Sequence, residues 1–236
     1  PATGRFWGAV PENVKSLKFL RYAITVNGAE ILDIQTGKSL GRFEIPLERA
    51  ITIARVLDGL PVIYDCEIDG FGYMQREQYE RREDYAVGPW QLTALTNFRK
   101  PVENLYDTMR EMNKSVEKIQ PFFRKQDMPL REKLLSAFPV IFPENIFSSS
   151  VPNNIEINDI RANKGDALKF IAEYVGVPMA QVMAFGDGLN DTYMIKAAGV
   201  GVAMGNACEE LKAISDYVTS SCDNDGVAEG IKKFCF

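Results

Sequence analysis

Two aspartates lie four residues apart in a glycine-rich turn, Asp187 and Asp191 in the segment GDGLND at residues 186–191. Carboxylates crowded into one turn repel one another unless a cation neutralises them, and a site made of oxygen ligands suits Mg²⁺. A turn with one capping Asp or Asn is the simpler explanation of such a segment. A second carboxylate and an Asn exceed what one cap needs, so we predict a Mg²⁺ site at this turn.

The flanking residues indicate which elements position the turn. Residues 182–185 form a short apolar run, as expected for a buried parallel strand. From residue 193 onward, apolar side chains recur at helical spacing as far as Gly199, a residue type that often ends a helix. The turn is therefore expected to follow the carboxyl end of a strand, which is where ligands bind in open α/β sheets.

Three other polar segments could contribute to the same site. The segment TGR at residues 3–5 combines a hydroxyl, a glycine and a positive charge, which could bind a phosphate, although a helix-capping threonine is the simpler explanation. The Asn-Gly turn at residues 27–28 follows a β-branched run and could equally close a hairpin. Lys164 begins a predicted helix, where a lysine is usually solvated, but it could reach the edge of the sheet that carries Asp187.

Composition restricts the class of protein. The chain has 236 residues, enough for two small domains, and its apolar and charged fractions, 46% and 25%, are those of an ordinary globular protein. A net charge of −5 argues against a nucleic-acid partner, and the lack of any long apolar stretch argues against membrane insertion. The four cysteines are scattered without metal-binding spacing, so we expect reduced thiols in a cytoplasmic protein.

The sequence contains no histidine. This absence excludes Ser-His-Asp and Cys-His nucleophilic systems, histidine-ligated zinc sites and imidazole general bases. Any catalysis must therefore come from Asp, Glu, Lys, Thr, Ser or Arg side chains, or from a metal ion.

Hydrophobic periodicity divides the chain into two kinds of region. After residue 160 the pattern is a regular alternation of strands and helices, which indicates an α/β unit. Before it, hairpins mixed with helices indicate an α+β module, with a charged run at residues 76–84 as a solvated face or mobile loop. The elements predicted there are a hairpin at 29–43, helices at 50–57, 102–119 and 130–138, and strands at 62–64, 71–74, 146–147 and 155–157.

Six ordered segments together resemble one family. They are ATGR at 2–5, VNGA at 26–29, NKGDAL at 163–168, FGDGLND at 185–191, GVAMGNA at 201–207 and DNDGVAEGI at 223–231. The chain resembles the haloacid-dehalogenase (HAD) superfamily of phosphatases, specifically the Cof-type group with a type IIB cap. The resemblance implies a Rossmann-like α/β core with a parallel sheet, made by residues 1–32 and 158–236, and an inserted α+β cap domain at residues 33–157.

The resemblance also implies the site residues. The catalytic set is Thr3, Lys164, Asp187 and Asp191. The substrate-binding set is Thr3, Gly4, Asn27, Gly28, Lys164 and Asn190. In the family, the residue matching Asp187 binds Mg²⁺, the one matching Lys164 offsets charge on the phosphoryl group, and the one matching Asp191 orients that lysine. The residue matching Thr3 hydrogen-bonds a phosphoryl oxygen.

One family motif is absent. The first motif, Asp-x-Asp-Gly-Thr, supplies the nucleophile and the general acid/base, and no such segment occurs in residues 1–236. In the family it lies upstream of the ATGR segment. We therefore expect that a preceding segment with the central strand and both catalytic aspartates belongs to the protein, and that residues 1–236 alone are inactive.

The expected function is that of a Mg²⁺-dependent phosphatase, monomeric or homodimeric, that hydrolyses a small phosphorylated metabolite through an aspartyl-phosphate. A sugar phosphate or a phosphorylated cofactor is the expected substrate. A non-catalytic binding or regulatory protein of the same fold and a phosphomutase are the alternatives. Four cap residues are candidates for substrate contact, although a packed or exposed sheet surface is the simpler explanation of them: Tyr64, Asp65, Glu67 and Tyr73.

Overall fold

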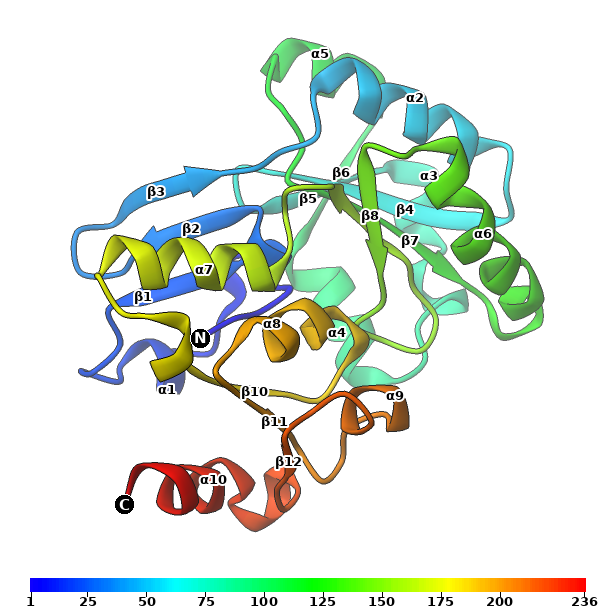
Figure 1. Cartoon of the computed structure of the whole chain (residues 1–236). Coiled ribbons are helices and arrows are strands. Elements are labelled where there is room, and N and C mark those ends of the chain that lie inside the picture. The colour runs from blue at the N-terminus through cyan, green and yellow to red at the C-terminus, as the bar shows by residue number, and fades with distance from the viewer.

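The computed structural model describes the whole chain, Pro1–Phe236, and arranges it around three sheets (Figure 1). The C-terminal sheet is parallel, in the order β10 (Met183–Gly186), β11 (Val200–Ala203) and β12 (Tyr217–Val218). The helices of this part are α7 (Lys164–Tyr174), α8 (Thr192–Ala197), α9 (Glu209–Lys212) and α10 (Gly226–Cys235). The strand–helix alternation expected after residue 160 is confirmed.

The N-terminal sheet is antiparallel and follows the short helix α1 (Glu12–Lys15). Its strands are β1 (Tyr22–Thr25), β2 (Glu30–Asp33) and β3 (Lys38–Arg42). Ala2 extends the sheet through a parallel bridge to Ile24. The Asn-Gly turn closes the β1–β2 hairpin, and β2 with β3 forms the hairpin expected at residues 29–43. Strand β10 lies at the edge of its own sheet, and no strand pairing joins it to the N-terminal sheet.

The third sheet has six strands and belongs to the middle of the chain. Its order is β6 (Arg99–Val102), β5 (Phe71–Gln75), β4 (Val62–Ile68), β7 (Lys118–Phe123), β9 (Glu156–Asp159) and β8 (Asn145–Ser148). All neighbouring strands are antiparallel except β5 and β6. Its helices are α2 (Leu47–Asp58), α3 (Arg76–Glu80), α4 (Pro89–Asn97), α5 (Leu105–Met112) and α6 (Met128–Ile141). We call this six-stranded sheet the cap sheet.

The two faces of the cap sheet differ in chemistry. One face packs against α2, α5 and α6 in the largest apolar cluster of the molecule (Figure 1). On β4 this face carries Tyr64 and Cys66, whereas Asp65 and Glu67 point to the opposite face. This alternation follows from the two-residue period of a strand. The opposite face therefore places polar side chains toward the rest of the molecule.

The expected boundary of the cap, at residue 33, falls on the last residue of β2. Residues 33–42 complete the sheet that contains β1. The chain crosses to the cap sheet at Ile45, which bridges Val116 and is buried in the cap cluster. It returns after Asp159, the last residue of β9, since Ala162 already packs with the N-terminal part.

The long helix expected at residues 102–119 is wrong, because only Leu105–Met112 is helical. Asn104 caps the start of α5 with its side chain, and Asn113 ends it in the left-handed conformation, with φ 49°. Ile119 therefore lies in β7. The charged run at residues 76–84 forms the short helix α3 and a 3₁₀ turn with mostly exposed side chains. None of the helices has both the length and the apolar composition needed to cross a lipid bilayer.

Candidate active site

Asp191 shapes the turn that follows β10. One oxygen of its carboxylate accepts hydrogen bonds from the backbone N–H groups of Asp187 and Gly188, at 2.9 and 3.1 Å. Gly186 permits this approach, since a Cβ there would lie 2.6 Å from the Cβ of Asp191. The other carboxylate oxygen accepts from Lys164 Nζ at 2.6 Å. Asp191 therefore both fixes the turn and holds the lysine.

Lys164 reaches Asp191 from the first turn of α7. Asn163 caps this helix with its side-chain oxygen, which accepts a backbone N–H at 2.8 Å. Gly165 lets α7 pack closely on α8, because a Cβ there would lie 2.4 Å from the carbonyl oxygen of Tyr193. Lys164 and Asp191 are buried, at 5% and 4% exposure. With one carboxylate partner, the ammonium keeps two N–H donors for another anion.

The carboxylate of Asp187 is exposed, in contrast to that of Asp191. Its side-chain partner is Asn206 Nδ2, at 3.3 Å. No three Asp, Glu or Cys side chains gather into a metal cage. Mg²⁺, however, is usually held by only one or two carboxylates, with water and substrate oxygens as its other ligands. Asp187 therefore fits the expected Mg²⁺ as a single protein ligand, whereas the oxygens of Asp191 are already engaged.

The N-terminal segment brings Thr3 and Gly4 to the same edge. The backbone of Thr3 is fixed by hydrogen bonds with Ile24 and Asn27, at 2.9 and 3.0 Å. Its hydroxyl oxygen accepts from the backbone N–H of Arg5 at 3.1 Å. This local turn leaves the hydroxyl proton free, so Thr3 can donate a hydrogen bond to an anion.

Asn27 and Gly28 lie behind the site, although we expected them to line the substrate pocket. Asn27 is buried in the left-handed conformation, with φ 61°. Its amide nitrogen donates to Glu156 at 2.8 Å, and its oxygen accepts from Asn190 at 3.2 Å. Gly28, with φ 105°, lies so close to Asn163 that a Cβ would be 2.6 Å from the carbonyl oxygen of that residue. Both residues support the pocket wall from behind.

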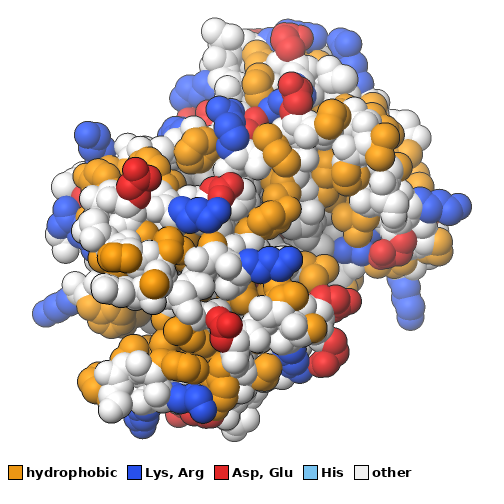
Figure 2. Space-filling view, in the orientation of Figure 1, with side chains coloured by type: hydrophobic (Ala, Val, Ile, Leu, Met, Phe, Trp, Pro, Cys, Tyr) orange, Lys and Arg blue, Asp and Glu red, His pale blue; other side chains and the backbone are white.

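A cavity of about 960 Å³ lies between this site and the cap sheet. Its core side is lined by every predicted site residue except Asn27 and Gly28, namely Thr3, Gly4, Lys164, Asp187, Asn190 and Asp191. Its cap side is lined by residues of β4, β6, β7, β9 and α4. Segments from both ends of the chain thus meet at one cavity, and the individual roles of their residues stay predictions. On the face seen in Figure 2, acidic and basic side chains are mixed.

The cap side of this cavity carries an ion network that the sequence analysis missed. Lys118 Nζ lies 3.1 Å from Glu156 and 3.5 Å from Glu67, and Arg99 Nε lies 2.8 Å from Asp65. All five side chains are at most 8% exposed. The available signal was the alternation of polar and apolar residues at the start of β7, of which residues 118–119 had been assigned to the end of a helix.

Burial and ionic partners determine how the two glutamates of this network titrate. Burial raises the pKa of Glu67, and the positive charges of Lys118 and Arg99 oppose this only in part. Burial also acts to raise the pKa of Glu156. The charge of Lys118 and a hydrogen bond from Asn27 outweigh that effect, so the pKa of Glu156 lies below its ordinary value. Glu156 is therefore the ionised partner of Lys118.

Of the four cap residues considered from the sequence, Glu67 lines the cavity. Asp65 lies on the same face of the sheet and binds Arg99. Tyr64 is buried in the apolar cluster on the opposite face, where its hydroxyl donates to Asp58 at 2.7 Å, and Tyr73 packs against the same cluster. The packed-surface explanation therefore holds for the two tyrosines.

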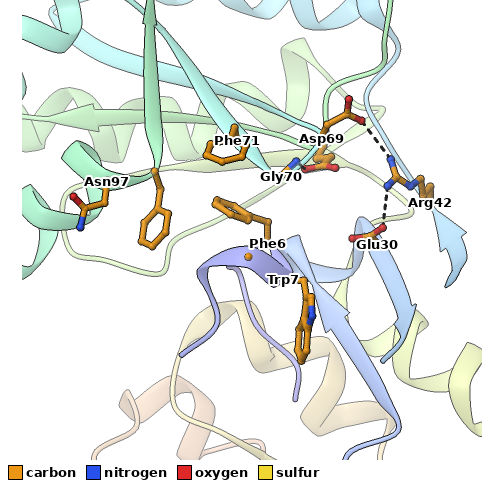
Figure 3. A pocket seen from close by; sticks show the side chains of 11 residues that line it. Phe6, Trp7, Glu30, Arg42, Asp69, Gly70, Phe71 and Asn97 are labelled. Atoms are coloured by element: carbon orange, nitrogen blue, oxygen red, sulfur yellow. Dashed lines mark hydrogen bonds and ion pairs between the residues drawn. The ribbon is translucent and has the colours of Figure 1, made fainter. Parts of the chain in front are cut away.

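A second cavity, of about 430 Å³, lies between the N-terminal segment and the β4–β5 turn (Figure 3). Its charged groups are partnered within the protein. Arg42 lies 3.0 Å from Glu30 and 3.9 Å from Asp69, and Glu117 accepts from the backbone N–H of Gly70 at 3.2 Å. None of the predicted site residues lines this cavity, so the candidate active site is the larger one.

Comparison with known proteins agrees with the resemblance. A relative from Bacillus subtilis (strain 168), 5-amino-6-(5-phospho-D-ribitylamino)uracil phosphatase YcsE, is 32% identical over 232 residues, which are 98% of this chain and 79% of the relative. The solved structure of a haloacid dehalogenase-like hydrolase from B. subtilis matches with a TM-score of 0.80 and 27% identity, covering 99% of this chain and 86% of that one.

The fold of the cap also has a counterpart. A solved HAD subclass IIB sugar phosphatase matches with a TM-score of 0.80 at 23% identity, over 99% of this chain and 84% of that one, which shows a shared fold. The family profile described as haloacid dehalogenase-like hydrolase matches residues 2–231. The chain therefore belongs to the haloacid dehalogenase-like hydrolase family, in its Cof-type branch.

Proposed function

We propose that this protein is a Mg²⁺-dependent phosphatase that hydrolyses a small phosphorylated metabolite. The observation that carries the proposal is the combination, at one cavity, of an exposed Asp187 carboxylate with the buried Lys164–Asp191 pair. The phosphatase names of similar proteins support the same activity. The expected cytoplasmic location and the monomeric or homodimeric state are part of the proposal.

The side chains have complementary roles toward a bound phosphate. Lys164 directs its free N–H donors at phosphoryl oxygens, where charge must be balanced during transfer. Asp191 keeps the ammonium in place, and the Thr3 hydroxyl donates to a further oxygen. A Mg²⁺ ion held by Asp187 would neutralise negative charge on the phosphoryl oxygens.

The nucleophile in this proposal is an aspartate outside residues 1–236. The lining carboxylates of the core already have other tasks, since Asp191 binds Lys164 and the turn backbone, and Asp187 is the proposed metal ligand. Attack by the external aspartate would give the aspartyl-phosphate expected from the sequence, which water then hydrolyses. The cavity leaves room for a sugar or a cofactor fragment beyond the phosphate.

The test uses the full-length protein with p-nitrophenyl phosphate. We expect hydrolysis that stops with a chelator and returns with Mg²⁺. Asp187→Asn and Lys164→Met should each lower kcat/KM by about 10³-fold, because each removes charge stabilisation of the transition state. Lys169→Met is the matched control, because Lys169 lies on the same helix but is exposed and binds Asp166.

Three outcomes would contradict the proposal. Hydrolysis by a preparation confirmed by mass to contain only residues 1–236 would show that no external nucleophile is needed. Binding of phosphate esters without turnover by the full-length protein would indicate a binding protein. Conversion of a hexose phosphate into its isomer, without release of inorganic phosphate, would indicate a phosphomutase.

A further inference from the structure

The second, smaller cavity contains a carboxyl group that no cation neutralises. Glu117 directly precedes β7, lines this cavity and is 3% exposed. One of its oxygens accepts a hydrogen bond from the backbone N–H of Gly70 at 3.2 Å. The other oxygen has no hydrogen-bond partner and, unlike the unpartnered oxygen of Glu67, it keeps some accessible surface. Because an unpaired buried carboxylate is unfavourable, this reachable oxygen points to a ligand that donates to it.

The cation that lines this cavity is engaged with other carboxylates. Arg42 lies 3.0 Å from Glu30 and 3.9 Å from Asp69, and it sits between these two side chains (Figure 3). Lys114, which does not line the cavity, also binds Asp69. Three carboxyl groups and one guanidinium thus line the cavity, and the carboxyl group without an ion pair is the buried Glu117. The cavity therefore suits a ligand with a positive charge.

Aromatic rings form another part of the wall. The ring centre of Phe6 lies 5.8 Å from that of Phe71 and 5.6 Å from that of Phe98. Figure 3 shows Phe6 and Phe71 on the side of the cavity away from Arg42. A metal ion would need several oxygen ligands, and no three acidic side chains of the chain gather to hold one. Rings beside a single reachable carboxylate oxygen instead suit an ammonium group attached to an apolar body.

Two of these rings also belong to the candidate active site. Phe6 and Phe98 line both cavities, so they form a wall between them. Phe6 follows the Thr3–Arg5 segment of the core, and Phe98 follows α4 of the cap. A molecule in the smaller cavity would therefore contact the core, the cap and side chains that also shape the larger cavity.

We propose that the smaller cavity binds a small organic amine, whose ammonium group pairs with Glu117 and whose apolar body packs against Phe6, Phe71 and Phe98. The ammonium donates a hydrogen bond to the oxygen of Glu117 that has no protein partner. None of the residues expected to bind phosphate lines this cavity. The inference therefore concerns a second ligand site and does not depend on the proposed phosphatase activity.

A matched pair of probes tests the proposal by titration calorimetry of the full-length protein at pH 8. 2-Phenylethylamine and 2-phenylethanol share one carbon skeleton and differ in their ammonium and hydroxyl groups. We expect the amine to bind at least about 10-fold more tightly, which is the size of effect that a hydrogen bond between charged groups produces. Ethylamine, which lacks the ring, should bind at least about 10-fold more weakly than 2-phenylethylamine.

Binding of the amine should also depend on pH through Glu117. Burial, aided by the charges of Glu67 and Glu30, raises the pKa of Glu117 to about 7. The N–H of Gly70 and the charge of Arg42 oppose this rise. A primary amine stays protonated between pH 6 and pH 8, so the ligand competes only with the proton on Glu117. The affinity should therefore be about 10-fold lower at pH 6 than at pH 8.

One substitution separates the charge of this group from its shape. Glu117→Gln should lower the affinity for 2-phenylethylamine at pH 8 by at least about 10-fold and abolish its dependence on pH. The affinity for 2-phenylethanol should change by less than about twofold, because the amide has the same shape and can still accept from Gly70. Glu111→Gln is the matched control, since Glu111 is an exposed cap residue that does not line the cavity.

Each outcome supports or overturns the proposal. Equal affinities for the amine and the alcohol, or equal binding of the amine by Glu117→Gln and the unmodified protein, would overturn it. Absence of amine binding at millimolar concentration would do the same. Asp187→Asn should leave amine binding unchanged, and a loss of binding in that variant would place the amine in the larger cavity instead. The titrations contain no phosphate ester, so a failure of the proposed phosphatase function would not alter their result.

Discussion

The turn after β10 and the polar face of the cap sheet both hold carboxylates beside cations, but they use them differently. In the turn, Asp191 is saturated by a lysine and two backbone N–H groups, while Asp187 remains exposed four residues earlier. On the cap face, acids and bases pair with one another, yet Asp65 Oδ1 and Glu67 Oε2 remain buried without hydrogen-bond partners. The turn thus presents an exposed carboxylate beside a fixed one, whereas the cap face buries all of its carboxylates in an ion network.

Removing Lys118 should produce the largest loss of stability. Lys118→Met leaves Glu156 and Glu67 buried without their shared cation, which should cost about 3–5 kcal/mol of unfolding free energy. Urea denaturation measures this loss. Lys114→Met is the control, since the pair of Lys114 with Asp69 is largely exposed and should change stability by less than about 1 kcal/mol. Similar losses of unfolding free energy in both variants would show that the buried ion network of the cap contributes no more to stability than an exposed ion pair.

The buried carboxyl group of Glu117 should make the stability of the protein depend on pH, with an effect of intermediate size. Burial, aided by the charge of Glu67, raises the pKa of Glu117 from an ordinary 4.5 to about 7. Between these values the folded state keeps a proton that the unfolded state has lost, so stability falls as the pH rises from 4.5 to about 7 and is level above. The loss should reach about 3 kcal/mol.

Glu117→Gln should remove this decline, because an amide does not titrate. The measurement is urea denaturation at pH 5, 6, 7 and 8, with Glu111→Gln at an exposed position as the control. The same decline in Glu117→Gln and in the unmodified protein would refute the assignment to this carboxyl group.

Asp187→Asn should have the smallest effect on stability, within about 0.5 kcal/mol, because the carboxylate is exposed and has a single long hydrogen bond. Asp191→Asn should cost several times more, since it removes the charge partner of buried Lys164. Thermal unfolding of the two variants side by side measures the difference. Equal losses of stability in the two variants would contradict the distinction between Asp187, whose carboxylate is exposed, and Asp191, whose carboxylate holds Lys164 and the turn.

Local signals made the turn predictable from the sequence. An apolar strand, two glycines and acidic residues at fixed offsets describe a strand–turn–helix whose interactions span only a few residues. The Lys164–Asp191 pair joins distant segments, but Lys164 begins the helix that precedes β10, so topology alone indicated the shared edge.

The residues on the cap side of the cavity could not be predicted from local sequence signals. Which face of β7 meets the cavity depends on its register with β4 and β9, and a shift of one residue would exchange Gln120 for Ile119. Apolar residues of α5 and β7 also continue one helical spacing across Asn113, so the end of the helix was not visible. A hairpin pattern likewise does not show which sheet the hairpin joins, so the sequence alone did not indicate that β3 extends the sheet of β1 and β2.

The Asn27-Gly28 pair has a consequence for the chemical ageing of the protein. An Asn followed by Gly loses ammonia readily, since glycine has no side chain to hinder attack of its backbone nitrogen on the amide. Here the product, an aspartate, would place a carboxylate oxygen where the amide nitrogen lies 2.8 Å from Glu156. Two buried acids in contact would repel, and the hydrogen-bonded link from Asn190 to the cap would open. How well burial protects the Asn27 amide from this reaction therefore determines how long the site keeps its shape.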